Sequence, residues 1–281
     1  MTGIRTAAVV GLGLVGGSLA RDLAARGVRV LGRDRDAASV EGALRDGTLH
    51  AALGPALEGI EEAELVVAAV PVTAAAAVLG EMAPRLRSAR LVTDVGSTKA
   101  SVCAAAEALG IGERFVGSHP LAGSHLSGWD ASRAGLFAGR RVFLAPTPST
   151  GGPALALARD LWSSLGALPE TVDAAAHDLL LARTSHLPHL ASVTLSRALA
   201  AAGVPRAELG PGGRDVTRLA GSSPEMWTAI ALDNAAPLAG ALESLRARLD
   251  ELHAALLRGD ADALHTFFAA ARDWWRESEE G

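Results

Sequence analysis

Short apolar runs alternate with longer amphipathic stretches over the first 172 residues of the chain. Several of these runs are nearly continuous in valine, leucine and alanine, as in strands of a parallel sheet that is covered on both faces. The runs are Ala7 to Val10, Val28 to Leu31, Leu65 to Val70, Leu91 to Asp94, Phe115 to Gly117, Val142 to Leu144 and Leu168 to Val172. Strands alternating with helices predict an α/β fold, here an N-terminal Rossmann-type doubly wound parallel sheet.

The stretches between and after these runs have helical spacing. They are Ser18 to Arg26, Ala74 to Leu86, Ala154 to Leu165, Ala174 to Ala202, Pro224 to Arg258 and Asp260 to Arg276. No strand pattern is present beyond Asp173. We therefore expect two domains, a Rossmann domain over residues 1–172 and an all-helical domain over residues 173–281.

One helical stretch carries a stripe of leucines spaced alternately four and three residues apart, which is the a/d pattern of a helix with one continuous apolar face. The stripe consists of Leu238, Leu242, Leu245, Leu249, Leu252 and Leu256. The pattern fits a core helix within one chain and fits equally a helix shared between two subunits. A homodimer through the C-terminal helices is our expectation.

The first strand runs into the glycine motif Gly11-Leu12-Gly13-Leu14-Val15-Gly16, and a helix follows. Gly11 allows a tight turn, Gly13 allows a pyrophosphate to approach the backbone, and Gly16 allows the helix to pack closely on the strand. The free amides and dipole at the start of that helix favour the phosphate charge. The context predicts a dinucleotide site, and the alternative is a merely structural turn.

An acidic residue, Asp34, stands eighteen positions after Gly16 at the tip of the second strand. A carboxylate there accepts hydrogen bonds from the hydroxyls of the adenosine ribose and repels a 2′-phosphate, so it favours NAD. Arg33 and Arg35 keep NADP open as an alternative. The expected cofactor-binding residues are Gly11, Gly13, Leu14, Val15, Gly16, Asp34, Arg35, Val70, Pro71 and Gly96.

Composition excludes several classes of protein. A formal net charge of −5 without a basic run argues against a nucleic-acid surface. The single cysteine, Cys103, excludes an internal disulfide framework and suits a reducing cytoplasm. The stretch from Arg5 to Ala20 could pass for a signal peptide, but its four glycines make a poor apolar helix. We expect a soluble cytoplasmic protein that does not enter a membrane.

A second landmark is the stretch FVGSHPLAGSHLSG, residues 115–128. His119 follows a predicted strand, and Pro120 holds the chain extended there. A histidine at the carboxyl edge of the sheet, close to a nicotinamide, can accept the proton of an alcohol while hydride leaves the adjacent carbon. The alternative is a histidine that only holds a loop in place.

The helical part contributes further polar candidates. His186 and His189 are three residues apart and share a helical face, and Pro188 between them is expected to bend or fray the helix. A zinc pair is a competing interpretation, but no third ligand is evident, so we expect no metal. Arg218 offers a guanidinium suited to a carboxylate, and Trp227 either lines a pocket or belongs to the core.

Five motifs together resemble the prephenate dehydrogenase family, which includes arogenate dehydrogenases. They are GLGLVGGSLA, VTDVGSTK, GSHPLAGS, SHLPH and GPGGRDVTRLAGSSPEMW, and they occur in the order of the family across nearly the whole chain. The resemblance implies oxidation of prephenate with NAD and loss of carbon dioxide, giving 4-hydroxyphenylpyruvate in tyrosine biosynthesis. It also implies a Rossmann domain paired with a helical dimerisation domain.

The resemblance further implies roles for individual residues. His119 binds and polarises the ring hydroxyl, and Ser97 of the GSTK sequence supports that contact. His189 and Arg218 belong to the substrate pocket, with Arg218 on a carboxylate. The full set expected at the substrate is His119 and Ser97 as catalytic residues, with His189, Arg218, His186, Ser124, Gly213 and Trp227 as substrate-binding residues. Ser124 and His125 stand where many relatives carry Thr-Glu.

Three alternatives stay open at this point. The substrate can be arogenate or an amino-deoxyprephenate instead of prephenate. The chain can be a β-hydroxyacid dehydrogenase or imine reductase, although these use a lysine of the helical domain, and the sole lysine here is Lys99. It can also be a dinucleotide sensor without catalysis. No chorismate mutase domain and no regulatory ACT domain are expected, so feedback by tyrosine through such a domain is not expected either.

Overall fold

The computed structural model describes residues 3–123 and 128–277. Its central feature is an eight-stranded sheet with the strand order β3-β2-β1-β4-β5-β6-β7-β8. The strands are β1 (Thr6–Val10), β2 (Arg29–Arg33), β3 (Ala51–Ala52), β4 (Leu65–Ala68), β5 (Leu91–Asp94), β6 (Phe115–Pro120), β7 (Arg141–Pro146) and β8 (Leu168–Thr171). All seven predicted strands are present. The two-residue β3 is too short to leave an apolar pattern in the sequence.

The strand order reverses at β1, which pairs with β2 on one side and with β4 on the other. This reversal opens a crevice at the carboxyl ends of the strands, which is where ligands bind in doubly wound sheets. The sheet is parallel from β3 to β6, but β7 runs antiparallel to β6, unlike the all-parallel sheet expected from the sequence. No long helix is described between β6 and β7, and the chain returns so that β7 lies next to β6 and runs in the opposite direction.

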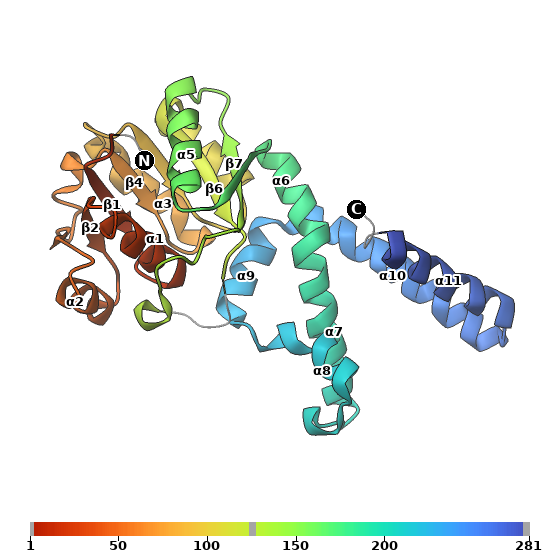
Figure 1. Ribbon diagram of the computed structural model, residues 1–281. Coiled ribbons are helices and arrows are strands. Elements are labelled where there is room, and N and C mark those ends of the chain that lie inside the picture. The colour runs from red at the N-terminus through yellow and green to blue at the C-terminus, as the bar shows by residue number, and fades with distance from the viewer. Residues whose placement is uncertain (1–2, 124–127, 278–281) are drawn as a thin grey trace. The chain divides into compact units, whose positions relative to one another are not determined.

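Helices cover both faces of the sheet (Figure 1). One core cluster includes Leu19 and Leu23 of α1 (Leu14–Ala24), Ala43 of α2 (Ala37–Arg45) and Trp162 of α5 (Gly152–Ser164). The other cluster includes Leu79 of α3 (Val72–Met82) and Val102 of α4 (Ala100–Ala108). The central strands therefore bury both faces, as their continuous apolar runs predict, whereas the edge strands β3 and β8 are mostly exposed.

The helical segment after β8 begins with α6 (Ala174–Leu181), passes through a π-helical turn (Ala182–His186) and continues as α7 (Leu187–Ala201). The π turn lies directly before Pro188, whose missing backbone N–H and ring disfavour regular helical bonding. The irregularity is therefore a π turn that precedes Pro188, whereas the sequence led us to expect a bend or fraying between His186 and His189. Two short elements, α8 (Pro211–Val216) and the 3-10 turn η7 (Arg218–Gly221), lead to α9 (Pro224–Asp233).

The chain forms two compact units, residues 1–234 and 235–281. The second unit consists of α10 (Ala235–Arg258) and α11 (Ala261–Glu277), which pack on each other. The helical stretch predicted from Pro224 to Arg258 is divided into two helices, because α9 ends at Asp233 and Asn234 leaves the helical conformation. The side chain of Asn234 bonds to Asp178 and His186, a tertiary contact that helical periodicity cannot reveal.

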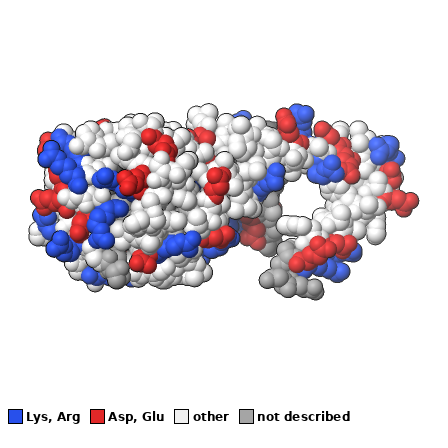
Figure 2. Space-filling view, turned by 90° about the horizontal axis from the view of Figure 1, so that it is seen from above, with Lys and Arg blue, Asp and Glu red and all other residues white. Residues whose placement is uncertain are grey.

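Basic and acidic side chains are interspersed on the face seen in Figure 2 rather than collected into one patch. Among the described residues, no helix combines the length and the apolar character needed to cross a bilayer.

Candidate active site

The glycine motif has the backbone geometry that its proposed role requires. Gly11 has a φ of +100°, and a Cβ there would lie 2.1 Å from the carbonyl oxygen of Ala69. A Cβ on Gly16 would lie 2.1 Å from the carbonyl oxygen of Gly11, so both positions exclude any side chain. A Cβ on Gly13 would meet nothing within 4 Å. The space at Gly13, directly before α1, is therefore open to a phosphate group.

Asp34 lies directly after β2 and faces the glycine motif. Its Oδ2 accepts a hydrogen bond of 2.6 Å from the backbone N–H of Leu12, and its Oδ1 accepts one of 2.9 Å from that of Asp36. Arg33 is 3.8 Å from Glu81 of α3, and Arg35 is exposed. Asp34 thus fixes the motif while one lone pair on each oxygen remains for a ribose hydroxyl.

The other residues expected at the cofactor follow neighbouring strands at the same edge. Val70 and Pro71 come after β4, and Gly96 comes after β5. The Gly96 amide donates to Asp94 Oδ2 over 2.8 Å. Leu14 and Val15 form the first turn of α1, which has no acidic side chain that would repel an anion. These residues fit a dinucleotide that lies across the crevice.

A cavity of about 540 Å³ opens beside this crevice. It is lined by Ser97, His119, Pro120, Leu121, Ala122, Arg141, Phe143, Leu180, Leu181, Thr184, Ser185, His186, Met226, Trp227 and Ile230. Four residues predicted for the substrate, Ser97, His119, His186 and Trp227, therefore meet in one pocket. Among the described residues that line it, Arg141 is the only charged side chain, and sequence reasoning missed it.

His119 stands at the end of β6 and is 8% exposed. Its Nδ1 lies 2.9 Å from Nε2 of His177, and Nδ1 of His177 lies 2.8 Å from Oδ1 of Asp178. Asp178 also accepts hydrogen bonds of 2.8 Å from the backbone amides of Lys99 and Ala100 at the start of α4. His119 is thus held through one ring nitrogen, and its Nε2 is the nitrogen left for the pocket.

His186 is held in a different way. The Nδ2 amide of Asn234 donates to the backbone oxygen of Asp178 over 2.8 Å and lies 3.1 Å from Nδ1 of His186. His189 does not line the cavity itself. Its ring stacks on Trp227 with centroids 3.4 Å apart and thereby supports one wall of the pocket.

Burial and nearby charge keep these histidines neutral. Burial, the fully buried ammonium of Lys99 and the neighbouring His177 and His186 hold the pKa of His119 well below its usual range. Burial lowers the pKa of His186 to about 4 and also lowers that of His189. Lys99 forms a buried ion pair with Asp94. It does not line the pocket, so it is not placed as a catalytic lysine would be.

Two carboxylates bind the β5–α4 connection to the helical segment. Burial opposes the ionisation of Asp178, but the hydrogen bonds from His177, Ala100 and Lys99 outweigh it and lower the pKa of that carboxyl. Asp233 of α9 accepts hydrogen bonds from Thr98 at 2.5 Å and Ser101 at 2.7 Å. Together they hold the loop that carries Ser97.

Among the described residues predicted for the substrate, Arg218 and Gly213 do not join the pocket, and His189 supports it only through Trp227. Arg218 lies exposed on η7, Gly213 lies on α8, and neither lines the cavity. Ser124 lies outside the described residues. His177, Asp178 and Asn234 were missed because they act through other side chains. The one available signal was the His-Asp pair at the start of a helical stretch.

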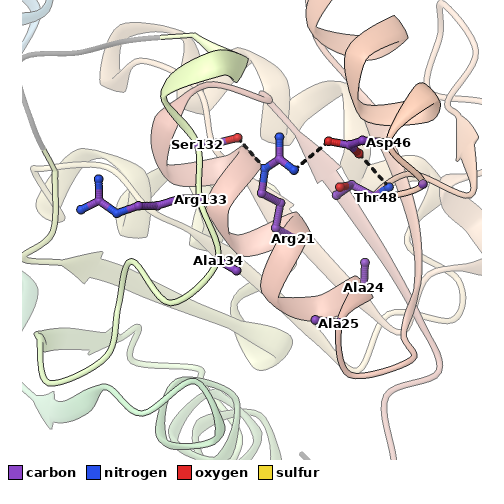
Figure 3. A pocket seen from close by; sticks show the side chains of 9 residues that line it. Arg21, Ala24, Ala25, Asp46, Thr48, Ser132, Arg133 and Ala134 are labelled. Atoms are coloured by element: carbon purple, nitrogen blue, oxygen red, sulfur yellow. Dashed lines mark hydrogen bonds and ion pairs between the residues drawn. The ribbon is translucent and has the colours of Figure 1, made fainter.

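A second cavity of about 440 Å³ lies over α1 and is shown in Figure 3. Its central cation, Arg21, already donates to Asp46 over 2.7 Å and to Ser132 over 2.9 Å. Arg21 also covers the ring of Trp129 at 4.0 Å. Since these contacts occupy the guanidinium, this cavity anchors the segment after residue 128 and is not our candidate site.

A Rossmann-type dinucleotide crevice beside a pocket with a neutral histidine defines a nicotinamide-dependent oxidoreductase. Models of known families agree. "Prephenate dehydrogenase, nucleotide-binding domain" matches residues 19–170, and "Prephenate dehydrogenase, dimerization domain" matches residues 173–270. The chain belongs to the prephenate dehydrogenase family.

Relatives with different substrate names are similar over almost their full length. A cyclohexadienyl dehydrogenase of Zymomonas mobilis is 34% identical over 95% of this chain and 94% of its own. A prephenate dehydrogenase of Aquifex aeolicus, solved with hydroxyphenyl propionate and NAD⁺, has a TM-score of 0.89, 28% identity and 98% coverage of both chains. An arogenate dehydrogenase of Synechocystis has a TM-score of 0.83 and 30% identity, covering 97% of this chain and 99% of its own.

Proposed function

We propose that the cavity beside β6 binds prephenate and that His119 accepts the proton of its ring hydroxyl. The activity is the NAD-dependent dehydrogenation of prephenate. NAD, when bound in the crevice, supplies the acceptor for the hydride. Loss of carbon dioxide then follows readily because it produces an aromatic ring.

The observation that carries this proposal is the environment of His119. Its Nδ1 is occupied by His177, and it lines the cavity. Its lowered pKa keeps it unprotonated at neutral pH. A general base must be unprotonated and within reach of the proton it removes, and His119 meets both conditions for a hydroxyl in this cavity. Ser97 lines the same cavity and is the candidate to orient that hydroxyl.

The substrate carries two carboxylates, which require positive or hydrogen-bonding partners. Arg141 offers a guanidinium at the cavity, where it also pairs with Glu170 at 2.6 Å. His186 offers a neutral N–H. Our sequence-based assignments of Arg218, His189, Gly213, Trp227 and Ser124 to substrate binding remain part of this proposal. Arg218 is the second candidate for a carboxylate.

Prephenate is favoured over arogenate by the residues that line the cavity. The two substrates differ in the side chain, which carries a keto group in prephenate and an ammonium in arogenate. An ammonium requires a carboxylate or several acceptors when it is buried. No Asp or Glu is among the described residues that line the cavity. Arogenate and amino-substituted prephenate are therefore the second candidates.

The test is a cofactor reduction assay with prephenate and arogenate side by side, each with NAD and NADP. We expect the highest kcat/KM for prephenate with NAD. A higher kcat/KM for arogenate would overturn the substrate assignment, and no reduction with either substrate would overturn the proposed function.

We further infer a homodimer in which residues 173–281 form the helical dimerisation domain and residues 1–172 the Rossmann domain. The matched dimerization model supports it, and so do exposed leucines of the predicted stripe, Leu249 at 55% and Leu256 at 58%. Light scattering at micromolar concentration is expected to give twice 28.6 kDa. A species of 28.6 kDa alone would contradict the dimer. We also propose a cytoplasmic location, which the single buried cysteine supports.

A further inference from the structure

We propose that His177 and Asp178 are positioning residues that turn the Nε2 lone pair of His119 to the substrate and receive the positive charge when His119 takes the proton. This inference rests on the proposed function, because it presupposes that His119 is the base. It concerns two residues that do not line the substrate cavity.

Hydrogen-bond direction fixes the tautomers of His177 and His119 in the series Asp178, His177 and His119. The carboxylate of Asp178 can only accept, so Nδ1 of His177 donates to it. In a neutral His177, Nε2 is then the acceptor, and Nδ1 of His119 must donate to it across 2.9 Å. The remaining nitrogen of His119, Nε2, therefore carries the lone pair. This is the tautomer that a base facing the cavity requires.

Charge explains why the imidazolium forms on His177 and not on His119. The ring of His119 is buried near the ammonium of Lys99, which pairs with the Asp94 carboxylate but still lowers the pKa of His119. His177 is equally buried but lies 2.8 Å from the carboxylate of Asp178. A positive charge is far more stable beside a buried carboxylate than beside a buried ammonium.

Proton transfer runs from the substrate through His119 to His177. The substrate O–H bond breaks as an N–H bond forms at Nε2 of His119, while the hydride leaves for the cofactor. The Nδ1–H bond of His119 breaks as an N–H bond forms at Nε2 of His177. His119 ends neutral with its proton on Nε2, and the imidazolium of His177 is paired with Asp178. Two protons move in the chemical step.

Substitution of His177 separates the two roles. In His177→Gln, the side-chain amide can place an oxygen near the position of Nε2, which preserves the acceptor for His119 but cannot take a proton. His177→Phe removes both. We expect single-turnover NADH formation to slow at least tenfold in His177→Gln and by more in His177→Phe. Neither loss should exceed the roughly 10²–10⁴-fold that a general base contributes. KM for prephenate and the affinity for NAD are expected to stay near wild type.

A proton inventory supplies a readout that a merely structural role would not move. The single-turnover rate is measured in mixtures of H₂O and D₂O. We expect a curved dependence on deuterium fraction in the wild type, from two protons in flight, and a linear one in His177→Gln. Asp233→Asn is the control for disturbance of the loop alone, because Asp233 holds the same loop through Thr98 and Ser101 and is not a member of the His119–His177–Asp178 chain. It is expected to keep the wild-type curve.

Three outcomes would overturn the proposed proton relay from His119 to His177. They are a wild-type rate in His177→Gln, a linear inventory in the wild type, or a linear inventory in Asp233→Asn. The proposed function has its own test, since a near-wild-type rate in His119→Asn would show that His119 is not the base. An inactive His119→Asn beside a fully active His177→Gln would refute the relay alone.

Discussion

The side-chain amide of Asn234 lies 3.1 Å from Nδ1 of His186 and also donates to the backbone oxygen of Asp178. A carbonyl can only accept, so this contact identifies the amide nitrogen, whose second hydrogen points to His186. Nδ1 of His186 is therefore an acceptor, and its proton lies on Nε2. The cavity thus contains a histidine prepared to donate, His186, and one prepared to accept, His119.

The lowered pKa of His119 determines the pH dependence of catalysis. Protonated His119 cannot accept the hydroxyl proton, so kcat/KM falls as pH drops through this pKa. Because burial and Lys99 hold the pKa well below 6.5, we expect kcat/KM to stay level through pH 6.5 and fall only in more acidic solution. An unperturbed histidine would instead place this limb near 6.5. A pH–rate profile of the free enzyme that shows its acidic limb at or above 6.5 would contradict this environment.

The buried neutral His186 also makes stability depend on pH. Its pKa is about 4 in the folded chain and near 6.5 when the chain is unfolded. The unfolded state therefore binds more protons than the folded state between these two pH values. The stability that neutral His186 contributes is complete above pH 6.5 and is lost as pH falls towards 4. We expect the urea midpoint to decrease from pH 7.5 to pH 5, with a smaller decrease in His186→Gln. The exposed His50 supplies the control, and an equal decrease in His50→Gln and His186→Gln would refute the assignment.

Asp34 is expected to set the preference for NAD over NADP, because its charge repels a 2′-phosphate. Asp34→Ala also removes the acceptor for the Leu12 amide, so weaker binding of both cofactors is expected. Asp34→Asn is the cleaner variant, because it keeps an acceptor and loses only the charge. Discrimination against NADP should relax in both variants. A wild-type enzyme that uses NADP as well as NAD would refute the role.

Two arginines are candidates for a substrate carboxylate. The carboxylate is charged in both the ground and transition states, so losing its partner raises KM more than it lowers kcat. We expect Arg141→Ala to raise KM for prephenate about tenfold, the order of one hydrogen bond to a charged group. Arg218→Ala is expected to raise KM as well if the sequence-based assignment holds. Glu170→Gln controls for the lost ion pair, and unchanged KM in both arginine variants would leave neither as the carboxylate partner.

The sequence predicted the fold to a large extent because its strands are continuous apolar runs and its glycine motif has one main structural use. It could not predict that β7 runs antiparallel to β6, because strand direction depends on how the connecting chain returns to the sheet. That reversal brings Val142 opposite Pro120 and Phe143 opposite His119, next to Arg141 at the edge of the cavity. For the same reason, Arg141 carried no sequence signal.

Several residues that line the cavity were predicted from motifs, whereas residues that contact those side chains from behind were missed. His119, Ser97, His186 and Trp227 have recognisable motif positions, and all of them line the cavity. Asn234 is hidden inside an apparently continuous helical pattern, and only the fold brings it to His186. His177 is separated from His119 by 58 residues, so their contact is likewise tertiary information.

We propose that His119 accepts the hydroxyl proton, and the rate of NADH formation from prephenate by His119→Asn tests this role most directly. Asparagine keeps a polar group of similar reach but cannot act as the base. We expect unchanged NAD affinity and a loss of roughly 10²–10⁴-fold in kcat. A kcat within a few-fold of wild type would contradict the account, because another group would then be taking the proton.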